Sequence, residues 1–248
     1  MSADRLESHL GSLRALLMTA LQRLGDPADT ESLHEMRVVL RRLRMLLRPL
    51  KCSGQAGQLR DAAAGLFRQT NSLRDNEVLL EELVRNGMHV AAAARQAQQM
   101  RDRQALMDSP GLAGLIAAWP DDGVACLSAP SRRRRRSLKK KMRCELAKAR
   151  RILRRQLRQP APDLHEVRLA IKRLRYRLLA KGHSSPSLLV QLERGQEVLG
   201  QWHDHDVWLL RAVTEPDLQA CIDRWQHEKA VLQARWLPLR DGLLLVLA

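Results

Sequence analysis

The chain has 248 residues, 45% of them hydrophobic and only 3% aromatic, and its 43 Lys and Arg residues outnumber 27 acidic ones, giving a formal net charge of +16. Residues that favour helices dominate those that favour strands, so we expect an all-α protein. A surplus of positive charge is tolerated most easily beside a polyanion. The few aromatic rings argue against a platform on which single-stranded bases stack.

The cysteines and the N-terminal residues exclude further classes of protein. The four cysteines are scattered with no C-x-x-C spacing, so neither a zinc site nor a disulfide framework is expected. The charged N-terminus has no signal-peptide pattern, and the longest apolar run, residues 243–248, is too short to span a membrane. We therefore expect a cytoplasmic protein that needs no cofactor and binds no membrane.

Helix-ending and helix-capping residues define the first expected helices. A first helix is expected to end at Asp26 and Pro27. Ser32 with Glu35 predicts a capping box at the start of a second helix. This second helix is expected to end near Pro49.

The rest of the first half is also expected to be helical. A third helix is expected over residues 55–73, and Asp75 is the expected N-cap of a fourth helix. A helical stretch rich in Ala and Gln then continues to about Asp108. Residues 120–130, which contain Pro, Gly and Ser, are the expected linker after a first helical bundle over residues 1–119.

The second half, residues 131–248, is expected to form a second helical bundle on the same plan. A long basic helix is predicted over residues 131–158, and a proline-rich break follows it. The next helix is predicted over residues 164–181, with Asp163 or Leu164 at its start.

Three further helices complete the expected second half. The first ends at about Gln201, a short one follows Asp204, and the last starts at Pro216. About four helices in each half predict a pair of four-helix bundles.

Two pairs of similar segments indicate an internal duplication. Residues 33–47 and residues 164–178, about half the chain apart, are identical at eight of fifteen positions. A weaker pair, residues 73–78 and 202–207, follows in the same order at a similar spacing. The sequence therefore predicts two pseudo-symmetric four-helix bundles that arose from a duplicated half-unit.

Cations follow one stripe of each repeated segment. At about 100° per residue, the cations lie within about 80° of one another and border the apolar face. The first stripe consists of His34, Arg37, Arg41, Arg44 and Arg48. The second consists of His165, Arg168, Lys172 and Arg175. Side chains beside a core have packed stems, so we expect rows of cations that are held in place for a chain of phosphates.

The long basic helix supplies further candidate residues. Lys141, Lys148, Arg151 and Arg155 share one side of it and are a further candidate stripe for the same ligand. The arginine run over residues 132–136 is the densest charge in the chain. Whether this run is a solvated helix entry or contacts a ligand stays open.

The two repeated segments resemble the paired signatures of the CHAD family, the conserved-histidine α-helical domain. H-x-x-R-V-x-x-R-R-L-R spans residues 34–44, and H-x-x-R-x-x-x-K-R-L-R-Y spans residues 165–176. The later LRDNEV and LGQWHD segments look like further elements of that family. The resemblance covers essentially the whole chain and adds Arg42 and Arg173 to the candidate site.

The resemblance implies both an architecture and a ligand. It implies two four-helix bundles related by a pseudo-twofold axis, whose signature helices face a central basic groove or pore that binds inorganic polyphosphate. Members are associated with polyphosphate granules or are fused to a CYTH-type triphosphatase domain, whose E-x-E-x-K motif is absent from this chain. We therefore expect a stand-alone, non-enzymatic polyphosphate-binding protein at cytoplasmic granules, without catalytic or metal-ligating residues.

Several alternatives stay open. The same basic surface also suits nucleic acid, and a run of arginines on a helix is often only a solvated face. The HDHD segment at residues 203–206 resembles the ligands of HD-type hydrolases, but Asp204 aligns with Asp75, for which helix capping is the simpler role. Thr70 and Asn71 stand where the family commonly has Leu-Gly. The sequence decides neither the role of the two signature histidines nor the oligomeric state.

Overall fold

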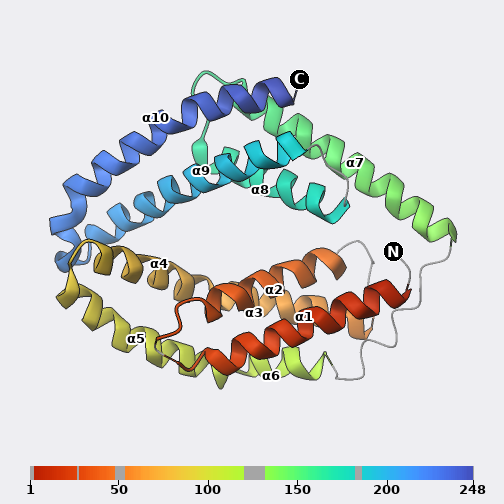
Figure 1. Cartoon of the computed structure of the whole chain (residues 1–248), viewed down its shortest axis with the longest axis horizontal. Helices are drawn as coiled ribbons and strands as arrows, with labels where there is room; N and C mark the ends of the chain where they lie inside the picture. The colour runs from red at the N-terminus through yellow and green to blue at the C-terminus, as the bar shows by residue number, and fades with distance from the viewer. Residues whose placement is uncertain (1–2, 27, 48–53, 120–131, 182–185, 248) are drawn as a thin grey trace. The chain divides into compact units, whose positions relative to one another are not determined.

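The computed structural model describes residues 3–26, 28–47, 54–119, 132–181 and 186–247, and these ranges contain helices and no strand (Figure 1). The all-α class predicted from composition is confirmed. By its internal contacts the chain divides into two compact units, residues 1–135 and 136–248, and each unit has its own apolar core. The linker expected at residues 120–130 lies outside the described residues.

The first unit is built on three helices that share a leucine-rich core. Its helices are α1 (Ala3–Arg23), α2 (Ser32–Leu47), α3 (Gln55–Gln69), α4 (Asn71–Arg85), α5 (His89–Met107) and α6 (Pro110–Ala117). Most leucines on one face of α1, α2 and α3 are almost fully buried against one another, and Trp119, just after α6, packs into the same core and is 1% exposed. The short α6 was not expected from the sequence, because its eight residues carry no clear apolar period.

An aspartate in the connection before α2 caps this helix. The Oδ1 atom of Asp29 accepts hydrogen bonds from the backbone N–H groups of Glu31 at 2.9 Å and Ser32 at 2.7 Å. Its Oδ2 atom pairs with Arg23 at 2.6 Å, and this bond lowers the pKa of Asp29 well below its usual range. The predicted capping box is wrong, because Ser32 already lies inside the first turn and Glu35 pairs with Arg23 instead.

A break at Thr70 separates α3 from α4. The expected helix over residues 55–73 ends at Gln69, and α4 then begins at once at Asn71. Asp75 therefore lies in the second turn of α4, and its predicted role as an N-cap is wrong. Thr70 is buried, and its backbone N–H still donates to Leu66 O at 3.1 Å, so the break does not leave this buried donor unpaired.

Gly87 ends α4 in a Schellman motif. Its φ of 73° lies in the left-handed region, which a residue with a Cβ atom adopts at a cost. The N–H of Met88 donates to Leu83 O at 2.9 Å, and that of Gly87 to Val84 O at 3.0 Å. The chain then turns directly into α5.

A buried ion pair fixes α5 against α4. Arg103 of α5 and Glu77 of α4 are 4% and 3% exposed, and their side chains meet at 2.6 Å. Arg103 also donates to the carbonyl groups of Asp26 and Asp29, at 3.1 and 2.9 Å, so it joins the α1–α2 connection to the same pair. Arg74 reaches the other oxygen of Glu77 at 2.6 Å. These bonds satisfy a carboxylate that burial alone would destabilise.

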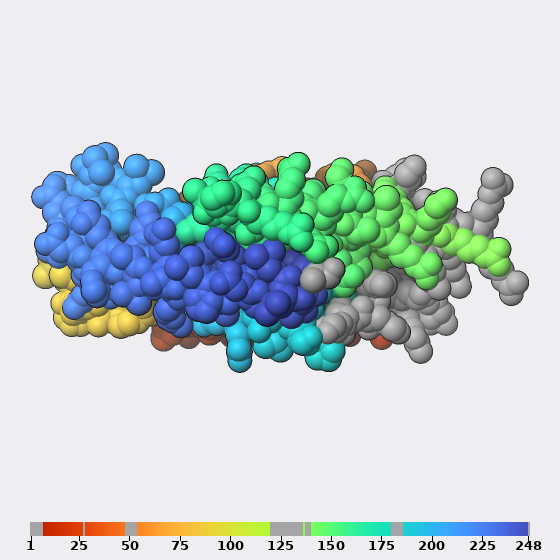
Figure 2. Space-filling model, turned by 90° about the horizontal axis from the view of Figure 1, so that it is seen from above, coloured from red at the N-terminus to blue at the C-terminus, as the bar shows by residue number. Residues whose placement is uncertain are grey.

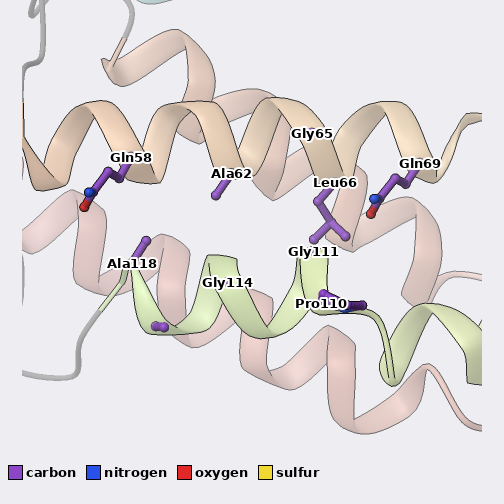
Figure 3. A pocket seen from close by; sticks show the side chains of 10 residues that line it. Gln58, Ala62, Gly65, Leu66, Gln69, Pro110, Gly111, Gly114 and Ala118 are labelled. Carbon is purple, nitrogen blue, oxygen red and sulfur yellow. The ribbon is translucent and has the colours of Figure 1, made fainter.

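A pocket of about 450 Å³ lies between α3 and α6. Small residues line most of it, and Figure 3 shows Gln58 and Gln69 of α3 toward its two ends. None of the residues that line it carries a charge. This pocket is therefore unsuited to a polyanion.

The second unit contains fewer and longer helices. They are α7 (Arg132–Leu157), α8 (Leu164–Lys181), α9 (Pro186–Ala212), the 3-10 helix η2 (Pro216–Cys221) and α10 (Ile222–Val246). One face of each of the four α-helices contributes to a single apolar core. Figure 2 shows α10, in dark blue, and α7, in green, on the same side of this unit.

The starts of α7 and α8 agree with the sequence prediction to within a residue. Asp163 caps α8, because its Oδ1 atom accepts from the N–H groups of His165 at 2.9 Å and Glu166 at 3.3 Å. Arg177 of α8 pairs with Glu145, the one acidic residue in the sequence of α7, at 2.8 Å. This pair adds a polar link between two helices that already share the core.

The prediction for the later helices of this unit is wrong at two places. The expected break between Gln201 and Asp204 does not occur, because α9 runs unbroken from Pro186 to Ala212. Asp204 is therefore not an N-cap. The last helix begins at Ile222, and the residues from Pro216 form a 3-10 turn before it.

Gly195 allows three helices of this core to approach closely. A Cβ atom at Gly195 of α9 would lie 3.2 Å from Trp236, 3.3 Å from Ile171 and 3.4 Å from Leu243. These side chains come from α10 and α8, and all three are buried. A larger residue here would force both neighbouring helices outward.

Candidate functional site

The α2 stripe lies at the edge of the core, as its angular position predicts. Arg37, Arg41 and Arg44 are half-buried, whereas His34 at the start of the helix is exposed. Arg48, the last predicted member of the stripe, lies outside the described residues. The three arginines therefore combine packed stems with charged ends near the surface.

Three guanidinium groups of this stripe surround one aromatic ring. The Cζ atoms of Arg37, Arg44 and Arg41 lie 4.4, 5.0 and 5.5 Å from the ring centroid of Phe67 on α3. Each distance falls within the range of a cation–π contact. Phe67 is the only phenylalanine in the sequence. Sequence reasoning missed it, although a single Phe in a chain so poor in aromatic residues was a usable signal.

Arg37 is also bound to the break between α3 and α4. Its Nη1 atom donates to Thr70 Oγ1 at 2.7 Å and to Phe67 O at 3.3 Å, and its Nη2 atom donates to Asn71 Oδ1 at 3.0 Å. Burial first, and then repulsion from Arg41, lower the pKa of Arg37 to about 10. The side chains of Thr70 and Asn71, the two departures from the family pattern, accept two of these three bonds.

The α8 stripe has the same placement as the α2 stripe but different neighbours. Arg168, Lys172 and Arg175 are half-buried, and His165 is exposed. Arg175 forms an ion pair with Glu193 of α9, so part of its charge is neutralised within the unit.

A histidine that sequence reasoning did not assign to the site stands beside the α8 stripe. The ring of His203 on α9 lies 5.2 Å from the ring of His165, measured between centroids. Burial first, and then repulsion from Arg168, His165 and Lys172, lower the pKa of His203 to about 4. In the repeat His203 aligns with Arg74, which is not a member of the α2 stripe, so the repeat did not point to His203.

The next histidine on α9 serves the core instead. His205 is buried, and its ring nitrogens contact Gln201 O at 2.8 Å and the carboxylate of Glu228 on α10 at 2.9 Å. Its ring also packs 4.8 Å from Trp208. His203 and His205 thus have separate surroundings, and the described residues contain no group of three or more His, Cys, Asp or Glu side chains arranged to hold a metal ion.

The candidate stripe of α7 lies opposite the buried face of its helix. The buried side chains of α7 are Leu146, Ala149, Leu153 and Leu157. The stripe residues, all exposed, are Lys141, Lys148, Arg151 and Arg155. They therefore lack the restriction by packing that the α2 and α8 stripes have.

The remaining predicted cations are also exposed or fall outside the description. Arg42 and Arg173 are exposed and lie away from the stripes of their helices. The side chains of residues 132–135 lie outside the described residues, and Arg136 is exposed. No helix in the described ranges is both long enough and apolar enough to cross a membrane.

These arrangements suit a multiply charged anion. Like charges brought close together repel one another, and an anion bound between them removes that repulsion. Guanidinium groups pair with phosphate oxygens through two parallel hydrogen bonds, and ammonium groups act as compact charges. Both stripes can therefore act as binding surfaces for phosphate groups.

Comparisons with known proteins agree with this architecture. A sequence model of the CHAD domain matches residues 5–213. A crystal structure of the CHAD domain from the plant Ricinus communis resembles this chain with a TM-score of 0.58 and 24% sequence identity, over 94% of this chain and 88% of that one. Curated proteins give no match. At this identity the structural likeness concerns the fold alone.

Proposed function

Because the chain belongs to the CHAD family, we propose that it binds inorganic polyphosphate through the cation stripes of α2 and α8. The resemblance of its paired signatures to those of a family that binds polyphosphate supports the ligand. The half-buried position of the stripe arginines supports the site. The proposed action is binding without catalysis.

One observation carries the proposal: Arg37, Arg41 and Arg44 converge on the single ring of Phe67 at 4.4 to 5.5 Å. The ring holds three like charges in one place before any ligand arrives. The charge of Arg41 disfavours the charged form of Arg37, and a phosphate group bound beside the two relieves that repulsion. Binding then costs little side-chain ordering, because the guanidinium groups are already positioned.

The exposed cations of α7 have a different role in this proposal. Lys148, Arg151 and Arg155 remain in water, where salt screens their charges. They contribute attraction at a distance and faster association more than they contribute contact energy. Polyphosphate binding should therefore weaken as the salt concentration rises.

Nucleic acid is the competing ligand, and direct competition distinguishes the two. The affinities of the full chain for long-chain polyphosphate, tRNA and duplex DNA are measured at the same near-physiological salt concentration. Each bound nucleic acid is then titrated with polyphosphate. We expect polyphosphate to bind more tightly and to displace both. Nucleic acid that binds as tightly and resists displacement would overturn the proposal.

We also propose that the protein associates with polyphosphate granules. A fluorescent fusion should form foci in cells that contain polyphosphate and should be diffuse in cells that lack it. A fusion of the Arg41→Gln, Arg44→Gln variant should lose most of its foci even where polyphosphate is present. Foci that persist without polyphosphate would contradict granule association.

A further inference from the structure

His203 is placed at the α8 stripe by a helix that carries none of the signature cations. It lies on α9, its ring is partly exposed, and the His165 ring on α8 is 5.2 Å away, tilted by 51°. Its Nδ1 atom is buried and has no hydrogen-bond partner in the part of the chain that the structure describes. A buried ring nitrogen without a partner is uncommon and costs free energy.

Positive charges dominate the surroundings of His203. On α8 it faces Arg168, His165 and Lys172, which all disfavour a proton on its ring. On its own helix Asp206 has the opposite effect, but the carboxylate of Asp206 is itself paired with Lys229 of α10 at 2.5 Å. Burial lowers the pKa of His203 most and this repulsion lowers it further, to about 4, so the ring is neutral near pH 7.

An anion in this place reverses the balance. A phosphate group beside Arg168 and Lys172 offsets their repulsion of a proton on His203 and adds an opposite charge, which raises the pKa of the ring. The ring can then take a proton from the solvent and donate a charge-assisted hydrogen bond to a phosphate oxygen.

We propose that His203 is a phosphate-contacting residue of the second unit, and that it takes up a proton when a polyphosphate segment binds across Arg168 and Lys172. This inference rests on the proposed polyphosphate binding, and it adds that binding is coupled to the uptake of a proton by His203. Binding by the second unit therefore strengthens as the pH falls.

The aligned position of the first unit has no such property. Arg74 stands there, and it carries its charge at any physiological pH. It is held by Glu77 at 2.6 Å and by Glu81 at 3.4 Å. The surroundings of the two stripes therefore differ. The aligned residue is an ion-paired arginine, Arg74, in the first unit and a histidine that changes its charge, His203, in the second.

Proton uptake tests this inference directly. Titration calorimetry with long-chain polyphosphate is run at the same pH in buffers of different ionisation enthalpy, which gives the number of protons taken up on binding. We expect net uptake by the wild-type chain and a clear loss of uptake in His203→Gln. His227→Gln, which removes an exposed histidine of α10, is the matched control and should keep the wild-type uptake.

The pH dependence of affinity supplies a second readout. Because binding takes up a proton, the affinity should rise by up to about tenfold for each unit by which the pH falls, between the pKa values of bound and free His203. The His203→Gln variant should lose this contribution. His203→Arg should bind at alkaline pH at least as tightly as the wild-type chain does, because its charge is permanent.

Histidine NMR on the wild-type chain tests the inference without a variant, in case His203→Gln folds poorly. The ring nitrogen signals of His203 should change from neutral to protonated as polyphosphate is added at constant pH. Signals that stay neutral at saturation, with unchanged uptake in His203→Gln, would overturn the inference and leave the proposed function standing. No polyphosphate binding by the wild-type chain would overturn both.

Discussion

The two units carry nearly the same basic stripe on α2 and α8 but hold it in different ways. In the first unit Phe67 lies beneath three guanidinium groups, and Arg37 is hydrogen-bonded to the break at Thr70. In the second unit α9 continues without that break, and the ring of His203 lies beside the stripe. The neighbouring helix, more than the stripe itself, therefore decides how each set of cations is fixed and how it responds to pH.

An aligned pair of acidic residues shows the same contrast. Glu77 of α4 is 3% exposed and is bound by Arg103, which is itself 4% exposed. Its counterpart Asp206 on α9 is 51% exposed and pairs with Lys229. Both aligned residues are acidic, but Glu77 forms a buried structural link in the first unit and Asp206 forms a surface pair in the second.

Replacing each of these two carboxylates should give the largest difference in stability between the two units. Glu77→Gln leaves the buried Arg103 without its counter-charge, and we expect a loss of about 3 to 5 kcal/mol in the free energy of unfolding. Asp206→Asn disrupts an exposed pair and should cost less than about 1 kcal/mol. Urea unfolding of both variants, followed by circular dichroism, measures the difference. Equal losses would contradict the structural role assigned to Glu77.

Arg37 is expected to be a structural residue as well as a binding residue. Arg37→Ala removes hydrogen bonds that join α2 to the break at Thr70, and it should lower the free energy of unfolding by about 2 kcal/mol. Arg42→Ala removes an exposed arginine from the same helix and should change it by less than about 0.5 kcal/mol. Thermal unfolding compares the two, and an Arg37→Ala variant as stable as wild type would show that the junction does not need this contact.

His203 predicts a smaller, pH-dependent effect on stability in the second unit. Its pKa is about 4 in the folded chain, against 6.5 for an ordinary histidine, so the unfolded chain binds a proton that the folded chain does not. Stability should therefore fall as the pH drops from about 6.5 to about 4, with no such contribution above this window. In melting curves over this range, His203→Gln should gain stability relative to wild type as the pH falls. A constant difference would contradict the lowered pKa.

The exposed stripe of α7 should have the smallest effect on stability. Replacing Lys148, Arg151 and Arg155 by Gln removes charges that lie opposite the core, so the free energy of unfolding should change by less than about 0.5 kcal/mol per residue. The salt dependence of polyphosphate binding should become shallower. A large loss of stability would mean that these side chains make structural contacts.

The sequence predicted the features that depend on local periodicity. The all-α class, the extents of α2 and α8 and the half-buried position of their cations follow from apolar and basic residues repeated at helical spacing. The start of α8 at Asp163 or Leu164 was also predicted from local residues, and in the structure Asp163 caps this helix. Local patterns suffice where the partners are close in the chain.

Prediction from the sequence was wrong or incomplete where residues distant in the chain determine helix boundaries and side-chain contacts. Asp75 and Asp204 both look like caps, but the core contacts of their helices keep each of them inside a continuous helical segment. Phe67 and His203 join the stripes across helix pairs, and their spacing along the chain gives no direct sign of it. Such contacts depend on which helix faces come together, and a single sequence specifies that only through the whole fold.

The central claim is that positioned stripe cations, and not bulk charge, bind polyphosphate. The most direct measurement compares the affinity of two charge-matched variants of the first unit, Arg41→Gln with Arg44→Gln and Arg60→Gln with Arg101→Gln. Each variant removes two positive charges, but only the first pair surrounds Phe67. Arg37 is left intact because the loss of its hydrogen bonds would lower stability as well as affinity, and the two effects could not be separated.

The account predicts at least about a tenfold loss of polyphosphate affinity for the stripe variant, equivalent to roughly 1.4 kcal/mol, and less than about threefold for the control. Helicity by circular dichroism should be the same for both variants. Equal losses of affinity in the two variants would contradict the account, because they would show that net charge alone binds the polyanion.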